Sequence, residues 1–96
     1  SPPRKPLDRA SLETALRGNA TLLPHPWTRF AWTRERGGAT LFAAGRGYAV
    51  NLAFARHASA RRPVCIDDVR GARDLDAVLA LANEGHLVLQ RSRKSR

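Results

Sequence analysis

Hydrophobic positions that recur with a helical period predict three helices. In the first, Leu12, Ala15 and Leu16 share one face, and Gly18-Asn19 forms the stop. The third is the clearest, because Leu75, Val78, Leu79 and Ala82 follow the i, i+3, i+4, i+7 pattern and Gly85 ends it. The predicted helices cover about residues 9–17, 52–61 and 75–84, with the N-caps Asp8, Asn51 and Asp74. A single further turn, capped by Asp67 or Asp68, is expected before Gly71.

Between the first two helices the pattern changes to strict alternation. Trp27 to Arg36 predicts a strand with Phe30 and Trp32 on one face. Paired glycines at 37 and 38 supply the positive φ angles of a tight turn. Strands over 40–43 and 48–50 then complete a meander, and residues 86–90 form a separate closing strand. Pro24 and Pro26 exclude both a helix and a central strand from the segment before Trp27.

These elements predict an α+β fold of winged-helix-like type. A small antiparallel sheet, made by the meander before the helices and by the closing C-terminal strand, packs on three to four helices. The domain is expected to span residues 7–90, after an extended arm or linker at 1–6 and before a basic disordered tail at 91–96. The predicted core consists of Leu12, Leu16, Phe30, Trp32, Leu41, Phe42, Val50, Leu52, Phe54, Ile66, Leu75, Val78, Leu79, Leu87 and Leu89.

The charge of the chain is strongly positive but unevenly placed. Its 96 residues carry 17 Lys and Arg against 8 Asp and Glu, for a formal charge of +9. Six of the cations lie in the terminal segments, at Arg4, Lys5, Arg91, Arg93, Lys94 and Arg96. Without them the charge is +3, from 11 basic and 8 acidic groups, so the folded part is only mildly basic.

Candidate catalytic and metal-binding residues lack the partners that such sites need. A single cysteine, Cys65, excludes an internal disulfide and argues against a common structural zinc site. It lies between Val64 and Ile66, where an apolar setting favours an inert core thiol. None of the three histidines precedes the carboxylate of a His-x-Asp or His-x-Glu iron motif. The Gly45-Arg46-Gly47 segment favours a turn over a phosphate loop. We predict no catalytic residue, metal site or cofactor in this chain.

Arginines are the strongest candidates for contact with a partner. Four lie on the predicted hairpin region and three on the second helix, namely Arg29, Arg34, Arg36, Arg46, Arg56, Arg61 and Arg62. A basic wing beside a basic helix is a known arrangement for nucleic-acid binding, although solvated arginines are also common in Arg-rich proteins. In the tail, Arg91, Arg93, Lys94 and Arg96 either contact RNA without sequence preference or only increase solubility. No apolar run long enough to span a bilayer is present, which favours a soluble cytoplasmic protein.

Five segments resemble one family. They are Pro2–Leu7, Thr28-Arg29 with Trp32, Leu41–Tyr48, Ala58–Arg62 and Asn83–Leu87. Together they resemble the C-terminal winged-helix region of the JmjC-type, cupin-like ribosomal protein hydroxylases, over nearly the whole chain.

The resemblance implies a parent enzyme that uses Fe(II) and 2-oxoglutarate to hydroxylate a ribosomal protein. In that family the iron ligands and the cosubstrate site lie in an upstream domain, so no catalytic residue is carried over to this chain. The implied role is a non-catalytic accessory module that packs on the catalytic domain or contacts the ribosomal substrate, with RNA as a further partner.

Two other interpretations remain open. One is an autonomous nucleic-acid-binding winged-helix domain, which the seven arginines favour. The other follows from a weaker resemblance to peptide-binding modules of the PqqD type, which add a peptide as a strand to a sheet edge. Trp27 to Arg34 is the candidate edge, and Pro24 and Pro26 are the residues that would protect it.

Overall fold

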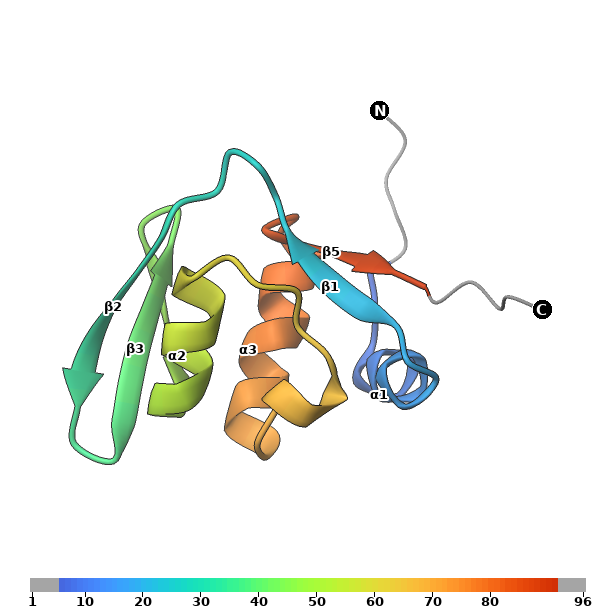
Figure 1. Ribbon diagram of the computed structural model, residues 1–96, viewed down its shortest axis with the longest axis horizontal. Coiled ribbons are helices and arrows are strands. Elements are labelled where there is room, and N and C mark those ends of the chain that lie inside the picture. The colour runs from blue at the N-terminus through green and yellow to red at the C-terminus, as the bar shows by residue number, and fades with distance from the viewer. Residues whose placement is uncertain (1–5, 92–96) are drawn as a thin grey trace.

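Residues 6–91, the part that the computed structural model describes, form three α-helices and two small antiparallel sheets (Figure 1). The elements in chain order are α1 (Arg9–Arg17), β1 (Thr21–Pro24), β2 (Phe30–Glu35), β3 (Gly38–Ala43), β4 (Arg46–Val50), α2 (Leu52–Ser59), the short 3-10 helix η1 (Ile66–Asp68), α3 (Ala72–Asn83) and β5 (Leu87–Gln90). The predicted α+β class is confirmed, and the arrangement is consistent with a small winged-helix-like domain. No helix within this part combines the length and apolar character needed to cross a membrane.

The helices α2 and α3 lie between the two sheets. In Figure 1 the three-stranded sheet is on the left, α2 and α3 occupy the middle, and β1 and β5 cross at the upper right above α1. The α3 helix contacts both β4 and β5, so it connects the two sheets, while α2 covers β2 and β3. One hydrophobic core runs through these layers and includes Phe54, Leu41, Val78 and Leu87.

The sheet arrangement corrects one expectation. The closing strand β5 does not join the meander but pairs with β1, with Leu22 opposite Leu89 and Pro24 opposite Leu87. The strand β1 was not predicted, because the prolines were taken to exclude pairing. Its only proline is the last residue of the strand, where a missing N–H is tolerated. On its other edge, Leu22 exchanges two backbone hydrogen bonds with Val64, of 2.9 and 2.8 Å.

The meander itself confirms the alternation seen in the sequence, with a shorter first strand. Leu41 lies between Trp32 and Tyr48 on the face that packs against the helices. The strand β2 begins at Phe30 rather than at Trp27, because the chain makes a turn at residues 25–28, where Thr28 N–H donates to His25 O over 3.1 Å.

The expected core is right for most positions and wrong for Phe42. This residue is 37% exposed because it lies on the outer face of β3, opposite Ala31 and Gly47. The core also holds Leu22 and Leu81, which were not predicted.

The turn between β2 and β3 uses its two glycines differently from the prediction. Only Gly37 has a positive φ, of 78°. At Gly38 the requirement is a close approach, because an added Cβ would lie 2.5 Å from the carbonyl oxygen of Val50. Both positions therefore need glycine, for separate reasons.

Two helix starts also differ from the prediction. Asp74 does not cap α3, which begins at Ala72 after Gly71. Asp74 instead is fully buried and accepts hydrogen bonds from Asn51 N–H (2.7 Å), Asn51 Nδ2 (3.0 Å) and Arg70 N–H (3.0 Å). Asn51 precedes α2 but makes no side-chain cap, because its Oδ1 accepts a hydrogen bond from Arg73 Nη2 over 2.7 Å instead.

Candidate functional site

An open cleft of about 660 Å³ lies where the two sheets approach each other. Three segments that are distant in the sequence form its walls: the 25–28 turn with Arg29, the β3–β4 turn at Ala44, and the connection from α3 to β5. The lining residues are His25, Trp27, Thr28, Arg29, Ala44, Glu84, Gly85 and His86.

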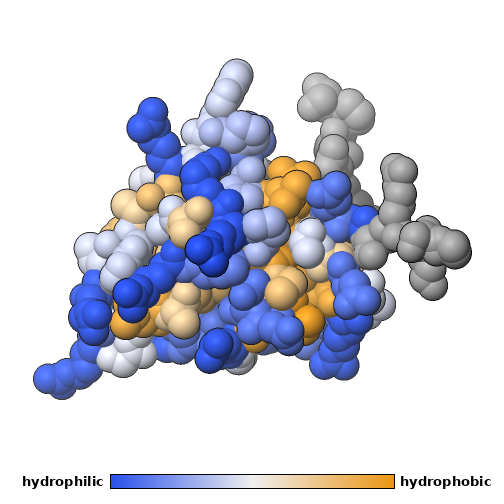
Figure 2. Space-filling model, viewed as in Figure 1, coloured by the Kyte–Doolittle hydropathy of each residue, from blue (hydrophilic) through white to orange (hydrophobic). Residues whose placement is uncertain are grey.

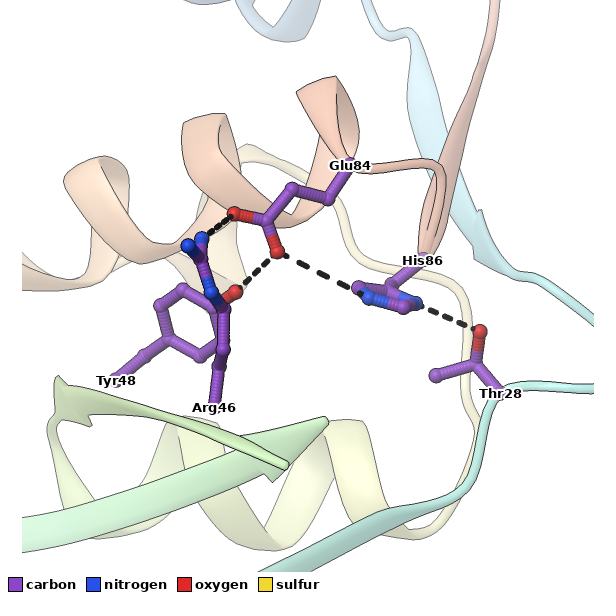
Figure 3. Close-up of polar contacts among 5 residues, drawn as sticks. All are labelled: Thr28, Arg46, Tyr48, Glu84 and His86. Carbon is purple, nitrogen blue, oxygen red and sulfur yellow. Dashed lines mark hydrogen bonds and ion pairs between the residues drawn. The ribbon is translucent and has the colours of Figure 1, made fainter. Parts of the chain in front are cut away.

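A carboxylate on this wall, Glu84, collects two donors from β4 (Figure 3). Arg46 Nη1 donates to Glu84 Oε2 over 2.6 Å, and the hydroxyl of Tyr48 donates to Oε1. The hydrogen bond from Tyr48 holds the pKa of Glu84 below its usual value of 4.5, and Arg46 adds to this effect. Burial, together with the hydrogen bond to Glu84, raises the pKa of Tyr48 above 10. At neutral pH Glu84 is therefore ionised, and both of its carboxylate oxygens already accept a hydrogen bond.

His86 extends the same network toward the turn. Its Nε2 lies 3.9 Å from Glu84 Oε1, and its Nδ1 shares a hydrogen bond of 2.9 Å with the hydroxyl of Thr28 (Figure 3). Thr28 is only 9% exposed, so this bond satisfies a buried hydroxyl. The backbone joins the same elements, because His25 N–H donates to His86 O over 2.9 Å.

Arg61 fixes the turn from the opposite side. Its guanidinium donates from Nη1 to Thr28 O over 2.6 Å and from Nη2 to His25 O over 2.8 Å. The backbone of Arg61 has a φ of 61°, a left-handed conformation that costs a non-glycine residue about 1–2 kcal/mol. A glycine would suit this conformation but would remove both side-chain bonds.

The tip of the turn presents Trp27 to solvent. This side chain is 88% exposed, and its ring meets His25 edge to face at a centroid distance of 6.2 Å. Burying an indole of about 200 Å² would contribute about 5 kcal/mol, a stabilisation that the described part of the chain does not obtain from Trp27.

The predicted arginines fall into two groups. Two of them have structural contacts: Arg46 pairs with Glu84 and Arg61 binds the turn. The side chains of Arg29, Arg34, Arg36, Arg56 and Arg62 are exposed and make no hydrogen bond or ion pair within residues 6–91. Figure 2 shows hydrophilic side chains gathered over α2 and the neighbouring β2, whereas hydrophobic ones reach the surface near β1 and β5. Arg91 is exposed, and the other predicted tail contacts, Arg93, Lys94 and Arg96, lie outside the described residues, as do 1–5 of the predicted arm.

The remaining reactive side chains form a separate polar cluster. His57 Nε2 lies 2.8 Å from Pro63 O and 3.3 Å from Asp68 Oδ2. The Cys65 thiol donates to the same Asp68 oxygen over 3.3 Å, and the Cys65 N–H is bound by it as well. The predicted cap at Asp67 or Asp68 is therefore wrong: the N-cap of η1 is Cys65, and Asp68 is the third residue of the turn, whose carboxylate accepts from the Cys65 N–H. Within residues 6–91, no three His, Cys, Asp or Glu side chains are grouped in a way that could hold a metal ion.

The edge expected to take up a peptide is shorter than predicted. The strand β2 is an edge of the three-stranded sheet, but only over Phe30–Glu35, and Trp27 lies outside it.

Sequence reasoning did not identify the Glu84 network or the exposure of Trp27. The one available signal was the run Pro24-His25-Pro26-Trp27, because a large aromatic residue between a proline-rich segment and a strand has no predicted core neighbour.

No protein-family model matches the chain, and a search of curated proteins finds none with significant similarity.

Proposed function

We propose that this chain is a non-catalytic winged-helix-like module of a cytoplasmic, JmjC-type ribosomal protein hydroxylase, and that it serves domain packing or contact with the ribosomal substrate. One observation carries the proposal. Four of the five segments that resemble this family meet around the same cleft, although they are spread over residues 28–87 of the sequence. They contribute Thr28, Ala44 with Arg46 and Tyr48, Arg61, and Glu84 with His86.

This convergence supports a shared structural role for the segments. Their side chains hold the ends of β4, α2 and α3 and the start of β5 to one turn, which creates a fixed surface rather than a reaction centre. A fixed surface is suited to docking, because little conformational freedom is lost on binding.

Iron and 2-oxoglutarate belong to the parent enzyme in this proposal. The described residues do not fit an iron site, since they contain no grouped set of metal-ligand side chains. Under the resemblance, the chemistry of the cofactor takes place in the upstream domain, and this chain supplies binding.

The reading frame that encodes the chain provides the first test. We expect an upstream, in-frame segment with a His-x-Asp or His-x-Glu pair and a distant histidine. A frame that opens at this chain would contradict the proposal. Turnover of 2-oxoglutarate to succinate by the isolated chain, with Fe(II) and a ribosomal peptide, would also contradict it.

The complete product of that frame provides the second test. Arg46→Gln removes a donor from Glu84, while Arg17→Gln removes an equal charge from an exposed arginine on α1 that makes no contact of its own side chain within residues 6–91. We expect the first variant to raise the KM for the ribosomal protein and to leave substrate-independent succinate release unchanged. The second should alter neither, and equal effects of the two would refute a role for the cleft.

An autonomous nucleic-acid-binding domain is the second candidate function. The five exposed arginines without partners favour it, because unpaired guanidinium groups are available to phosphates. The test is an RNA titration of the chain at low and at physiological salt, with residues 91–96 present and deleted. Affinity that disappears when these six residues alone are removed would exclude a folded binding face.

A further inference from the structure

Trp27 is the most exposed large hydrophobic side chain among the described residues, and its backbone is held on all sides. Thr28 N–H bonds to His25 O, Trp27 N–H bonds to His25 Nδ1 over 3.2 Å, and Arg61 binds the carbonyl groups on either side of the indole. The turn therefore keeps the indole outside in a fixed position. Solvent exposure here does not result from a loose loop.

Two arginines with exposed side chains lie in the segments next to Trp27. Arg29 is exposed two residues later, with no polar partner for its side chain within residues 6–91. Arg62 is exposed in the same way, and it directly follows Arg61, whose guanidinium binds the turn. The nearby carboxylate of Glu84 is occupied by Arg46 and Tyr48. Positive charge around the indole is thus left uncompensated.

An isolated aromatic ring with exposed arginines in the neighbouring segments favours one class of partner. A protein-docking surface of large area would be expected to expose further apolar side chains around the indole. The other two exposed large hydrophobic residues, Phe42 and Val88, lie on β3 and β5 and do not line this cleft. Single-stranded nucleic acids instead bind where bases stack on aromatic side chains and phosphates follow basic groups. The folded part carries a formal charge of +3 without the six terminal cations, which adds a mild long-range attraction for the same partner.

We propose that the 25–28 turn is a stacking platform for single-stranded nucleic acid, in which one base stacks on Trp27 and the flanking phosphates contact Arg29 and Arg62. Each residue of the platform belongs to this chain, so this affinity and membership of a hydroxylase are independent and are tested separately.

The experiment is a fluorescence anisotropy titration of the whole 96-residue chain. The probes are labelled oligouridylate, oligothymidylate and an abasic oligomer, each of about eight nucleotides, at about 50 and 150 mM salt. The variants are Trp27→Ala, Trp27→Phe and Arg29→Gln. Val88→Ala is the control, because it truncates another exposed hydrophobic residue, 48% exposed, outside the cleft. Circular dichroism of each variant verifies the fold, which the loss of an exposed indole should not affect.

We expect Trp27→Ala to weaken binding of both base-containing oligomers by at least about fivefold and to leave binding of the abasic oligomer unchanged. Trp27→Phe should retain most of the affinity, and Arg29→Gln should reduce the salt dependence for all three probes. Tighter binding of oligouridylate would identify RNA as the source of the base, and equal binding would identify a site for either nucleic acid.

Equal affinity of the wild type and Trp27→Ala for the base-containing oligomers would overturn the proposal. An abasic oligomer that binds as tightly as oligouridylate would overturn it as well. If the tryptophan fluorescence of the wild type, but not that of Trp27→Phe, responds to purified ribosomal proteins, and neither responds to the oligomers, the turn is a protein-docking site and the proposal is wrong.

Discussion

Replacement of Arg61 tests whether its side chain, rather than local backbone preference, maintains the 25–28 turn. The side chain donates to Thr28 O and His25 O, and the backbone at the same residue is left-handed, with a φ of 61°. Arg61→Ala removes both hydrogen bonds and keeps the unfavourable backbone. Arg61→Gly removes the same bonds and relieves the backbone, because glycine has no Cβ.

The structure allows both changes to be estimated. Two hydrogen bonds to carbonyl groups contribute a net of about 0.5–1.5 kcal/mol each, so Arg61→Ala should reduce the free energy of unfolding by about 1–3 kcal/mol. Relief of the left-handed backbone returns about 1–2 kcal/mol, and the greater freedom of glycine in the unfolded chain costs about 0.5–1 kcal/mol. Arg61→Gly should therefore be more stable than Arg61→Ala by about 0.5–1 kcal/mol.

Urea denaturation measures these free energies, and amide hydrogen exchange reports on the turn itself. Exchange at Thr28 N–H, which donates to His25 O, should accelerate in both variants, because both lose the side chain that holds the acceptor. Equal stability of the Ala and Gly variants would refute the inference of backbone strain. Unchanged exchange at Thr28 in both would show that Arg61 does not hold the turn.

Three further predictions concern stability. Asp74→Ala leaves Asn51 N–H without its acceptor in a fully buried site and should lower the free energy of unfolding, measured by urea denaturation, by about 3–5 kcal/mol. Asp76→Ala, on the exposed side of α3, should lower it by less than about 0.5 kcal/mol. Equal losses in the two variants would contradict this prediction. Because the pKa of Glu84 is lowered in the folded state, its ionised carboxylate stabilises the fold above pH 4.5, and the higher Tm of the wild type over Glu84→Gln should shrink as the pH falls below that value toward the folded pKa. A gap that is as large at pH ~3 as at neutral pH would refute the assignment. Ala44 has a φ of 52° in the two-residue turn between β3 and β4, so Ala44→Asn should raise the free energy of unfolding by about 0.5–1 kcal/mol; a lower Tm would count against it.

Elements with strong local signals could be predicted from the sequence. The helix at 9–17 begins after Asp8, whose carboxylate accepts from Ser11 N–H over 2.7 Å, and ends at the expected place. The alternation over 30–35 also gave the inward side of β2 correctly. In both cases the pattern and the stabilising contact lie within a few residues of each other, which is the range over which a sequence pattern is informative.

Features that depend on distant partners could not be predicted in this way. The short strand β1 exists because β5 and Val64 pair with its two edges, and both follow it by more than 40 residues. Asp74 was the predicted N-cap, yet Gly71 is the N-cap and the helix begins three residues earlier than predicted, while the carboxylate of Asp74 binds Asn51. The local propensity did not decide whether residues 21–24 form a strand or whether Asp74 caps the helix, and the tertiary contacts did.

The split into two sheets explains why the polar network lies at the cleft. A continuous sheet would join the meander to β5 through backbone hydrogen bonds, but these strands are not paired with each other. Side chains provide the connection instead, from β4 through Glu84 and His86 to Thr28. This connection orders the turn that carries Trp27 before any partner arrives. A partner that stacks on the indole therefore meets a surface whose ordering cost was incurred on folding, and its affinity should depend on the integrity of residues that it never touches.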